Sequence, residues 1–590
     1  MKKIFLLIAL FVTVLTISCK KESFLDTKTT ASLNEEITFA DSTNTMDFLA
    51  GLYVDMSYYF QITPAHNQRE TSKITDEGEG RYPAGGNFDK IFTQGTFANT
   101  YFNNYAADWL TFYGNIRKAN ILLRNMDRVP LSEAKKKRII AEARFLRVLY
   151  YHYLTRAFGG VPIVQDEVFD TNAVGTLVRN TWEECVNYMV SELDACANDL
   201  PPNYTGLDYG RITNGAALAL KSRILLYAAS PLYNGGGTSD KPELQKLLSY
   251  PTADRNRWEA ARRAAEAVMN LHIYDLYTDN STPWSGSATG KGQGFYEVFI
   301  TRVNNEFILS RLLPNGKQVE QGSLPRSRGG ANFYFYPTQE MVDKFPTING
   351  KSISSDVKSM SNPQGYDVSN PYANRDPRLS ATVIYNGSKF FLNSTKALSE
   401  VNTYVGAPSD GLVEVSKNTA TITGYYSRKM CDEYAAMTGG SNVERGLPII
   451  RYAEILLNYA EATNELDNSS EAMEILKELR IRAGINPGPD GMYGLPASPL
   501  KDEASELIKN ERAIELAFEQ HRLWDIRRWK DGPTLDGKYV HGMRITKSGS
   551  SYSYQVIDVR TRYFKDIYYY FPIPKDEVTL NPALLQNPGY

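Results

Sequence analysis

The position of Cys19 indicates a covalent modification. Two lysines at positions 2 and 3 precede the apolar run Ile4–Ile17, and the small residue Ser18 stands directly before the cysteine. A basic start, a short apolar stretch and a small residue before the cut are typical of a secretory signal. A cysteine directly after such a cut is where a bacterial lipoprotein receives its acyl chains. We therefore expect a signal peptide at 1–18 and lipidation of Cys19.

The alternative is cleavage elsewhere and a soluble secreted product, because Thr16 stands three residues before the cysteine, where a lipobox usually has Leu. A spanning helix is not expected, because the apolar run is shorter than the roughly 20 residues that a bilayer requires. The polar residues that follow the cysteine predict a lipid-anchored tether over 19–31.

Composition excludes several classes of chemistry. The 590 residues carry 65 Lys and Arg against 67 Asp and Glu, a net charge of −2 that argues against nucleic acid as the main partner. The 39 tyrosines suit wet binding surfaces and helix packing equally. The five histidines show no zinc spacing, and no nucleophile elbow or cofactor loop is present. We expect no catalytic residues, metal site or cofactor, and at most one disulfide, joining Cys185 or Cys196 to Cys431.

Periodic apolar stripes predict long helices connected in pairs. Ser132 caps a helix that runs to Phe158, and Thr181 and Glu184 form a capping box for the next helix. Trp109 falls on an apolar helical face and is expected in the core. The predicted hairpins pair 109–128 with 132–158, 181–200 with 215–230, 256–270 with 451–466, and 471–482 with 503–529. The helix Trp258–Met269 is similar to the first helix of a tetratricopeptide hairpin, so the predicted fold is mainly α and tetratricopeptide-like.

A long segment interrupts this pattern. Residues 275–445 are rich in Gly, Ser, Asn, Thr and aromatic residues, with short strand-like runs such as Ala381–Tyr385. We interpret the segment as an irregular, loop-rich insertion between helical hairpins. Long irregular segments on a rigid scaffold tend to carry function.

Three segments are specific enough to indicate a family: RFLRVLYYHYLTRAFGGVPIV at 144–164, ERAIELAFEQHRLWDIRRW at 511–529 and YYFPIPKDEVTLNPALLQNPGY at 569–590. Together they resemble the SusD/RagB family of outer-membrane nutrient-binding lipoproteins. Within the second segment we expect structural ion pairs between Arg512 and Glu515 and between Glu519 and Arg522. A catalytic role for Glu515, His521 and Asp525 is the disfavoured alternative.

The resemblance implies one SusD-like domain over 32–590, with an N-terminal half of about 32–270 and a C-terminal half of about 275–590. It implies an outer-membrane lipoprotein that faces the cell exterior and binds oligosaccharide or polysaccharide. It further implies a partner, a SusC-like TonB-dependent transporter that takes up the nutrient. A peptide or another nutrient as cargo is the alternative, and a surface glycoside hydrolase is a less favoured one.

Two regions carry the residue types that bind sugars. Aromatic rings pack against the apolar face of a pyranose, and planar polar side chains bind its hydroxyls. One region is Thr75–Asn104 and the other is the insertion. The candidate ligand-binding residues are Asp76, Arg81, Tyr82, Asn103, Trp284, Tyr296, Asn332 and Tyr334. For any one of them alone, loop packing or contact with the barrel is the alternative.

Overall fold

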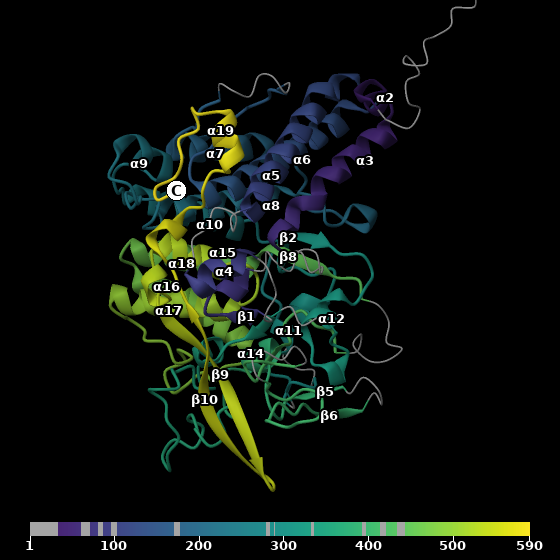
Figure 1. Cartoon of the computed structure of the whole chain (residues 1–590). Coiled ribbons are helices and arrows are strands. Elements are labelled where there is room, and N and C mark those ends of the chain that lie inside the picture. Colours follow the sequence, from purple (N-terminus) through teal and green to yellow (C-terminus); the bar gives the residue numbers. More distant parts are fainter. Residues whose placement is uncertain are drawn as a thin grey trace, which may run out of the picture.

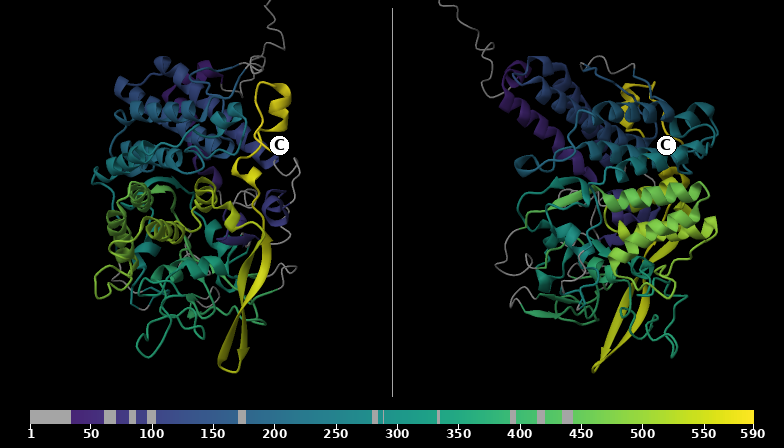
Figure 2. Two further views of the ribbon diagram at one scale, coloured as in Figure 1. Left: turned by 90° about the vertical axis from the view of Figure 1, so that its left-hand side faces the viewer. Right: turned by 180° about the vertical axis from the view of Figure 1, so that it is seen from behind.

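A computed structural model describes residues 34–60, 71–80, 87–95, 103–169, 177–278, 284–287, 289–331, 335–391, 397–413, 420–433 and 443–590. The predicted signal peptide, Cys19 and the tether lie outside these residues. Long helices form the upper part of the molecule, and the irregular insertion lies below them (Figure 1). Figure 2 shows the two parts stacked one above the other from two further directions.

The long helices pack in chain order, as the hairpin prediction requires. Helix α5 (Asn103–Asn125) packs on α6 (Glu133–Phe158), α6 on α7 (Trp182–Ala197), and α7 on α8 (Asn214–Ala229). Helix α10 (Asn256–Met269) then contacts both α8 and α15 (Tyr452–Glu465), so the chain leaves the stack for the insertion and returns to the same place. Helices α16 (Ser469–Ala483) and α17 (Lys501–Glu515) continue it. The mainly helical fold is confirmed.

Local signals predicted these boundaries because they act within a few residues of the chain. Thr181 and Glu184 form the expected capping box of α7, with both reciprocal hydrogen bonds present. Helix α6 ends where expected, at Gly159, whose φ of 79° is the left-handed region that favours glycine. Trp109 is 4% exposed, which confirms its place in the core.

The insertion contains short helices and two-stranded sheets. Strand β2 (Phe307–Leu312) pairs with β8 (Gly446–Arg451), and β5 (Lys389–Phe391) with β6 (Leu398–Glu400). The strand expected at Ala381–Tyr385 is only β4 (Val383–Ile384), paired with β7 (Tyr426–Ser427), because α14 (Pro377–Thr382) occupies its first half. The insertion also contains the short helices α11 (Gln293–Ile300), α12 (Gln318–Ser323) and α13 (Gln339–Lys344). Outside the insertion, the short helices are α2 (Glu35–Ala40), α4 (Asn87–Gln94) and α9 (Pro242–Leu248).

A long hairpin and the C-terminal tail join the two parts. Strands β9 (Lys538–Ser548) and β10 (Ser551–Arg562) pair antiparallel and run down one side of the molecule (Figure 2). The chain then returns to the helical stack, where Glu577 of α19 (Lys575–Leu580) lines a cavity together with Trp109 and Tyr113 of α5. Figure 1 shows α19 in the upper part of the molecule. Arg179 donates to the carbonyl oxygen of Leu585 (2.7 Å) and to Asn587 Oδ1 (2.9 Å), and these hydrogen bonds fix the tail to the body.

The three described cysteines are all buried and free. Cys185, Cys196 and Cys431 therefore make no disulfide in this structure. The fold depends on its core and on buried polar contacts instead.

The predicted continuous helix over 503–529 is wrong. Helix α17 ends at Glu515, and α18 (Arg522–Trp529) starts after a break in which Phe518 and Gln520 have φ of 62° and 64°. The Lys429 ammonium donates to the carbonyl oxygens of Glu515 (2.9 Å) and Ala517 (2.8 Å). A cation from the insertion thus binds the carbonyls that the end of α17 leaves unpaired.

The two ion pairs expected along that helix are also wrong, because the break turns their members toward other partners. Arg512 pairs with Asp525 (2.9 Å) and Arg522 with Asp76 (2.7 Å). Glu519 pairs with Arg451 (2.7 Å) and Lys429 (2.7 Å). These contacts are buried and join distant segments, whereas the expected pairs were exposed contacts between adjacent helical turns.

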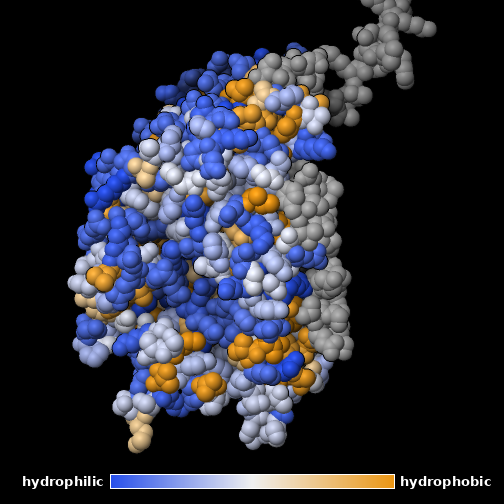
Figure 3. Space-filling model, turned by 60° about the vertical axis from the view of Figure 1, so that its left-hand side comes forward, coloured by the Kyte–Doolittle hydropathy of each residue, from blue (hydrophilic) through white to orange (hydrophobic). Residues whose placement is uncertain are grey.

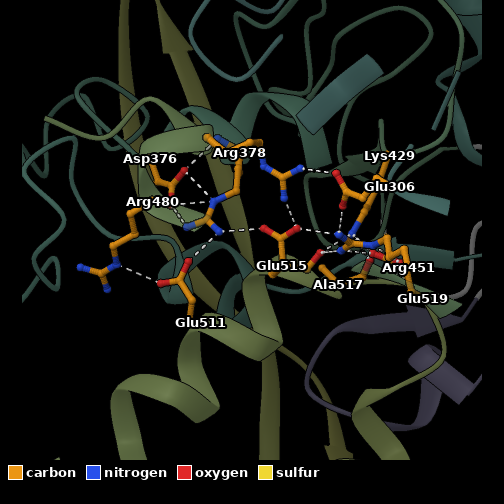
Figure 4. Close-up of polar contacts among 11 residues, drawn as sticks. Glu306, Asp376, Arg378, Lys429, Arg451, Arg480, Glu511, Glu515, Ala517 and Glu519 are labelled. Carbon is orange, nitrogen blue, oxygen red and sulfur yellow. Dashed lines mark hydrogen bonds and ion pairs between the residues drawn. The ribbon is translucent and has the colours of Figure 1, made fainter. Parts of the chain in front are cut away.

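Glu515 lies at the centre of this buried charge network (Figure 4). Its two oxygens bind Arg451 (2.7 Å), Arg378 (2.9 Å) and Arg482. Arg451 begins the chain's return to the stack, Arg378 belongs to α14, and Arg482 lies at the end of α16. Burial alone would raise the pKa of Glu515, but the three guanidinium groups hold that pKa well below its usual range.

We predict that Glu515→Gln lowers the free energy of unfolding by about 3–5 kcal/mol, because it leaves buried guanidinium charge without its counter-charge. Denaturant unfolding measures this. Glu474→Gln is the control, since its carboxylate is 57% exposed and pairs with Lys477 at the surface; its effect should stay within about 0.5 kcal/mol. Equal losses in the two variants would contradict the central role of Glu515.

The network also predicts a pH dependence. A carboxyl with a lowered folded-state pKa contributes stability above its unfolded pKa, about 4.3, and loses it as the pH falls. Between pH 6 and pH 3 the wild type should therefore lose more unfolding free energy than Glu515→Gln. Parallel curves for the two proteins would refute this.

Candidate ligand-binding site

Pairing of two short strands brings the two predicted binding regions together. Strand β1 (Gly78–Gly80) pairs antiparallel with β3 (Phe335–Pro337), and Gly80 is the partner of Phe335. Arg81 and Tyr82 follow Gly80 directly in the sequence, and Tyr334 directly precedes Phe335. The first region and the insertion therefore meet at one end of one small sheet.

Four of the candidate residues, Arg81, Tyr82, Asn332 and Tyr334, lie outside the described residues. Asn103 is the first residue of α5, and only its backbone is described. Their part in ligand binding stays a prediction.

Asp76 lies two residues before β1 and is held by two cations. Its carboxylate is 7% exposed and binds the Arg522 guanidinium at 2.7 and 2.9 Å and the Lys344 ammonium at 3.3 Å. Burial would raise the pKa of Asp76, but these two cations hold it well below its usual range. The side chain is therefore committed to partners within the protein, and it positions the backbone that leads into β1.

The neighbouring carboxyl has the opposite electrostatics. Burial raises the pKa of Glu77 to about 8, and the nearby Asp76 charge adds to the effect. The backbone N–H of Phe518 donates to Glu77 Oε1 at 3.3 Å, so the side chain also touches the break between α17 and α18. This carboxyl belongs to the residue that directly precedes β1.

Trp284 and Tyr296 form a stacked pair inside the insertion. Their ring centroids lie 4.4 Å apart at an interplanar angle of 18°, and the Arg428 guanidinium lies over Trp284 at 4.5 Å. Arg428 in turn pairs with Glu433 at 2.8 Å. The rings are 8% and 4% exposed, so the expectation of exposed aromatic faces is wrong for both. Their faces are used for packing, which sequence composition does not reveal.

The Trp284–Tyr296 pair nevertheless packs against the strand that leads to the candidate site. Trp284, Tyr296 and the β3 residue Tyr336 share one hydrophobic cluster, so the insertion core holds β3 in place. Within the described residues the Trp284 indole nitrogen has no hydrogen-bond partner.

The disfavoured catalytic residues are occupied by structural contacts. Asp525 binds Arg512 and Arg528, and Glu515 binds three arginines. Burial lowers the pKa of His521 well below its usual value.

The described residues contain no group of three His, Cys, Asp or Glu side chains placed to hold a metal ion. In that same part of the chain, no helix is both long and apolar enough to cross a membrane.

Comparison with known proteins identifies the family. Residues 308–590 match the family model described as the SusD family, and residues 23–226 match one described as starch-binding associating with outer membrane. The chain belongs to the SusD family. One relative, SusD-like protein P2 of Formosa agariphila, is 25% identical over 492 residues, which cover 82% of this chain and 80% of the relative.

Solved structures share the whole fold. A SusD-like protein of Bacteroides fragilis is 25% identical with a TM-score of 0.74, and the match covers 94% of this chain and 98% of that one. A SusD-like carbohydrate binding protein of the same organism is 24% identical with a TM-score of 0.69, covering 93% and 100%. Surface glycan-binding protein A of Bacteroides uniformis is 18% identical with a TM-score of 0.59, covering 92% and 99%.

We predict that Glu77→Gln raises the free energy of unfolding progressively as the pH increases from 5 to 8. A carboxyl whose folded-state pKa is raised loses its contribution to stability between its unfolded value, about 4.3, and its folded value. Glutamine stays neutral and avoids this loss. Denaturant unfolding at several pH values measures the difference.

Glu79→Gln is the matched control on the same strand. Glu79 binds Arg560 (2.8 Å) and Arg562 (2.7 Å), so its neutralisation should destabilise the protein throughout this pH range. A Glu77→Gln protein whose difference from the wild type does not change with pH would contradict the raised pKa.

Proposed function

We propose that this protein captures oligosaccharide or polysaccharide outside the cell and delivers it to a SusC-like TonB-dependent transporter in the outer membrane. The observation that carries the binding site is the pairing of Gly80 with Phe335. Family membership supports the function, as does the similarity of the fold to a SusD-like carbohydrate binding protein and to a surface glycan-binding protein.

The strand register supports a site built from Arg81, Tyr82, Asn332 and Tyr334. Antiparallel partners lie about 4.5–5.5 Å apart, and each further residue adds a Cα step of about 3.8 Å. Chain connectivity therefore allows Arg81 and Tyr334 to contact one ligand, although 253 positions separate them. Two aromatic rings and two planar polar groups are the combination that recognises a pyranose.

Rigid support suits this role. Asp76 with Arg522 fixes the approach to β1, and the cluster around Trp284 and Tyr296 fixes β3. Binding loops held at both ends lose less conformational entropy when a ligand orders them. The protein itself transforms nothing in this proposal: it concentrates the glycan next to the transporter.

We predict that Tyr82→Ala and Tyr334→Ala each weaken glycan binding about tenfold or more, the effect of truncating an aromatic hot spot. Isothermal titration measures it, after affinity electrophoresis against starch, xylan, mannan and laminarin has found the glycan. Tyr188→Ala on α7 is the control and should bind as the wild type does. A wild type that binds none of these glycans but purifies with peptide would overturn the carbohydrate assignment, and turnover of a bound glycan would overturn the binding-only role.

Attachment to the membrane has a separate test. We propose that Cys19 carries the lipid and that the tether 19–31 leaves the body free to move over the transporter. In cells producing Cys19→Ala, the protein should move from the membrane fraction to the soluble fraction, with ligand affinity and folding unchanged. Lys20→Ala is the control and should remain with the membrane. Unaltered membrane retention of Cys19→Ala would exclude this anchor.

A further inference from the structure

A cavity lies where the helical stack meets the insertion. It is formed by the α7–α8 connection, the chain just after α10 and the start of β2, and its volume is about 170 Å³. None of the candidate residues named above lines it. Its wall contains three tyrosines and three asparagines: Tyr204, Tyr209, Tyr274, Asn203, Asn304 and Asn305.

Two of the tyrosine rings, those of Tyr204 and Tyr274, are held in fixed positions. The Tyr204 hydroxyl donates to Glu142 Oε1 at 3.2 Å, and the Tyr274 hydroxyl bonds the Thr213 hydroxyl at 3.2 Å. Tyr274 fits only because position 215 is glycine, since a Cβ there would stand 2.2 Å from its hydroxyl oxygen. Fixed aromatic rings accept a ligand at little cost in side-chain entropy.

Two of the asparagine amides are free to bind a ligand. Asn203 and Asn305 are exposed, and within the described part of the chain neither side chain has a hydrogen-bond partner. Asn304 differs from them, because its amide donates to the carbonyl oxygens of Val298 and Thr301. The cavity therefore combines fixed rings with unoccupied planar amides, each of which can donate and accept hydrogen bonds.

The charge of the cavity favours a neutral ligand. Arg211 is the cation in its wall, and that guanidinium already binds Glu142 (2.7 Å) and Asp208 (2.9 Å). An anionic ligand would find no unpaired cation among the lining residues. The volume is also below the roughly 300–1,000 Å³ of sites for drug-sized ligands, which limits the bound unit to a single ring or a chain end.

We propose that this cavity is a second carbohydrate subsite, which binds one neutral pyranose unit between the tyrosine rings and the amides of Asn203 and Asn305. Only the class of ligand rests on the proposed function; the position is independent of the β1–β3 loops. A glycan that occupies both places would bind with higher apparent affinity than either place gives alone.

The test uses Asn203→Ala/Asn305→Ala and Tyr209→Ala, with Asn187→Ala on α7 as the matched control for loss of an exposed amide. Because Asn203 and Asn305 have no partners within the described protein, their removal should leave the melting temperature unchanged. Maltoheptaose, cellohexaose, xylohexaose and mannohexaose are the neutral probes for titration, and an oligogalacturonate is the charged one. Both cavity variants should bind the neutral probe that the wild type binds about tenfold more weakly. Hydrogen exchange at 203–211 and 304–305 should slow when that probe is present.

The same titrations separate this subsite from the loops. In Tyr82→Ala/Tyr334→Ala, the residual affinity for the neutral probe should disappear once Asn203→Ala/Asn305→Ala is added. Binding that is lost in the cavity variants but not in the loop variants would support the subsite and overturn the loop site. Unchanged affinity and unchanged exchange in the cavity variants, a preference for the charged probe, or no binding of any neutral probe would overturn the subsite.

Discussion

The structure depends on the requirement that buried charges find partners. Glu515 pairs with three arginines, which come from α14, from the end of β8 and from the end of α16. An unpaired charge in this interior would cost several kcal/mol, so the insertion, the stack and the break after α17 must assemble together. The charge network thus connects the scaffold to the region that carries the proposed binding loops. The face of the molecule shown in Figure 3 is mostly hydrophilic, with smaller hydrophobic patches scattered over it.

Local chemistry made most of the helical scaffold predictable. The apolar stripe and the glycine stop of α6, and the capping box of α7, act within a few residues, so one sequence suffices to find them. Prediction from local signals fails in the segment 511–529. Its charges have the spacing of exposed helical pairs, but Lys429 and Arg451 compete for the carbonyls and carboxylates there, and those competitors are distant in sequence.

The candidate site was predictable by residue type but not by position. Strands of three residues, such as β1 and β3, have no periodic signal, so their pairing could not be read from the chain. Trp284 and Tyr296 have the composition of a binding surface, but Arg428 lies over one of the rings and buries both of them in packing. Two of the cavity tyrosines have a signal in the sequence: PPNYTGLDYGR at 201–211 places two tyrosines and an asparagine in a short connection between helices.

The attachment of the tail to Arg179 bears on how the chain matures. Arg179 donates to the carbonyl oxygens of Phe158 and Gly160 at the end of α6, and within the described residues it has no carboxylate partner. Burial lowers its pKa to about 10. Its other hydrogen bonds within the described residues go to Leu585 and Asn587, more than 400 positions further along the chain. The N-terminal half therefore cannot complete its own hydrogen bonds before the segment around Leu585 has been synthesised. A chain that stops before Leu585 would leave this buried guanidinium without two of its acceptors.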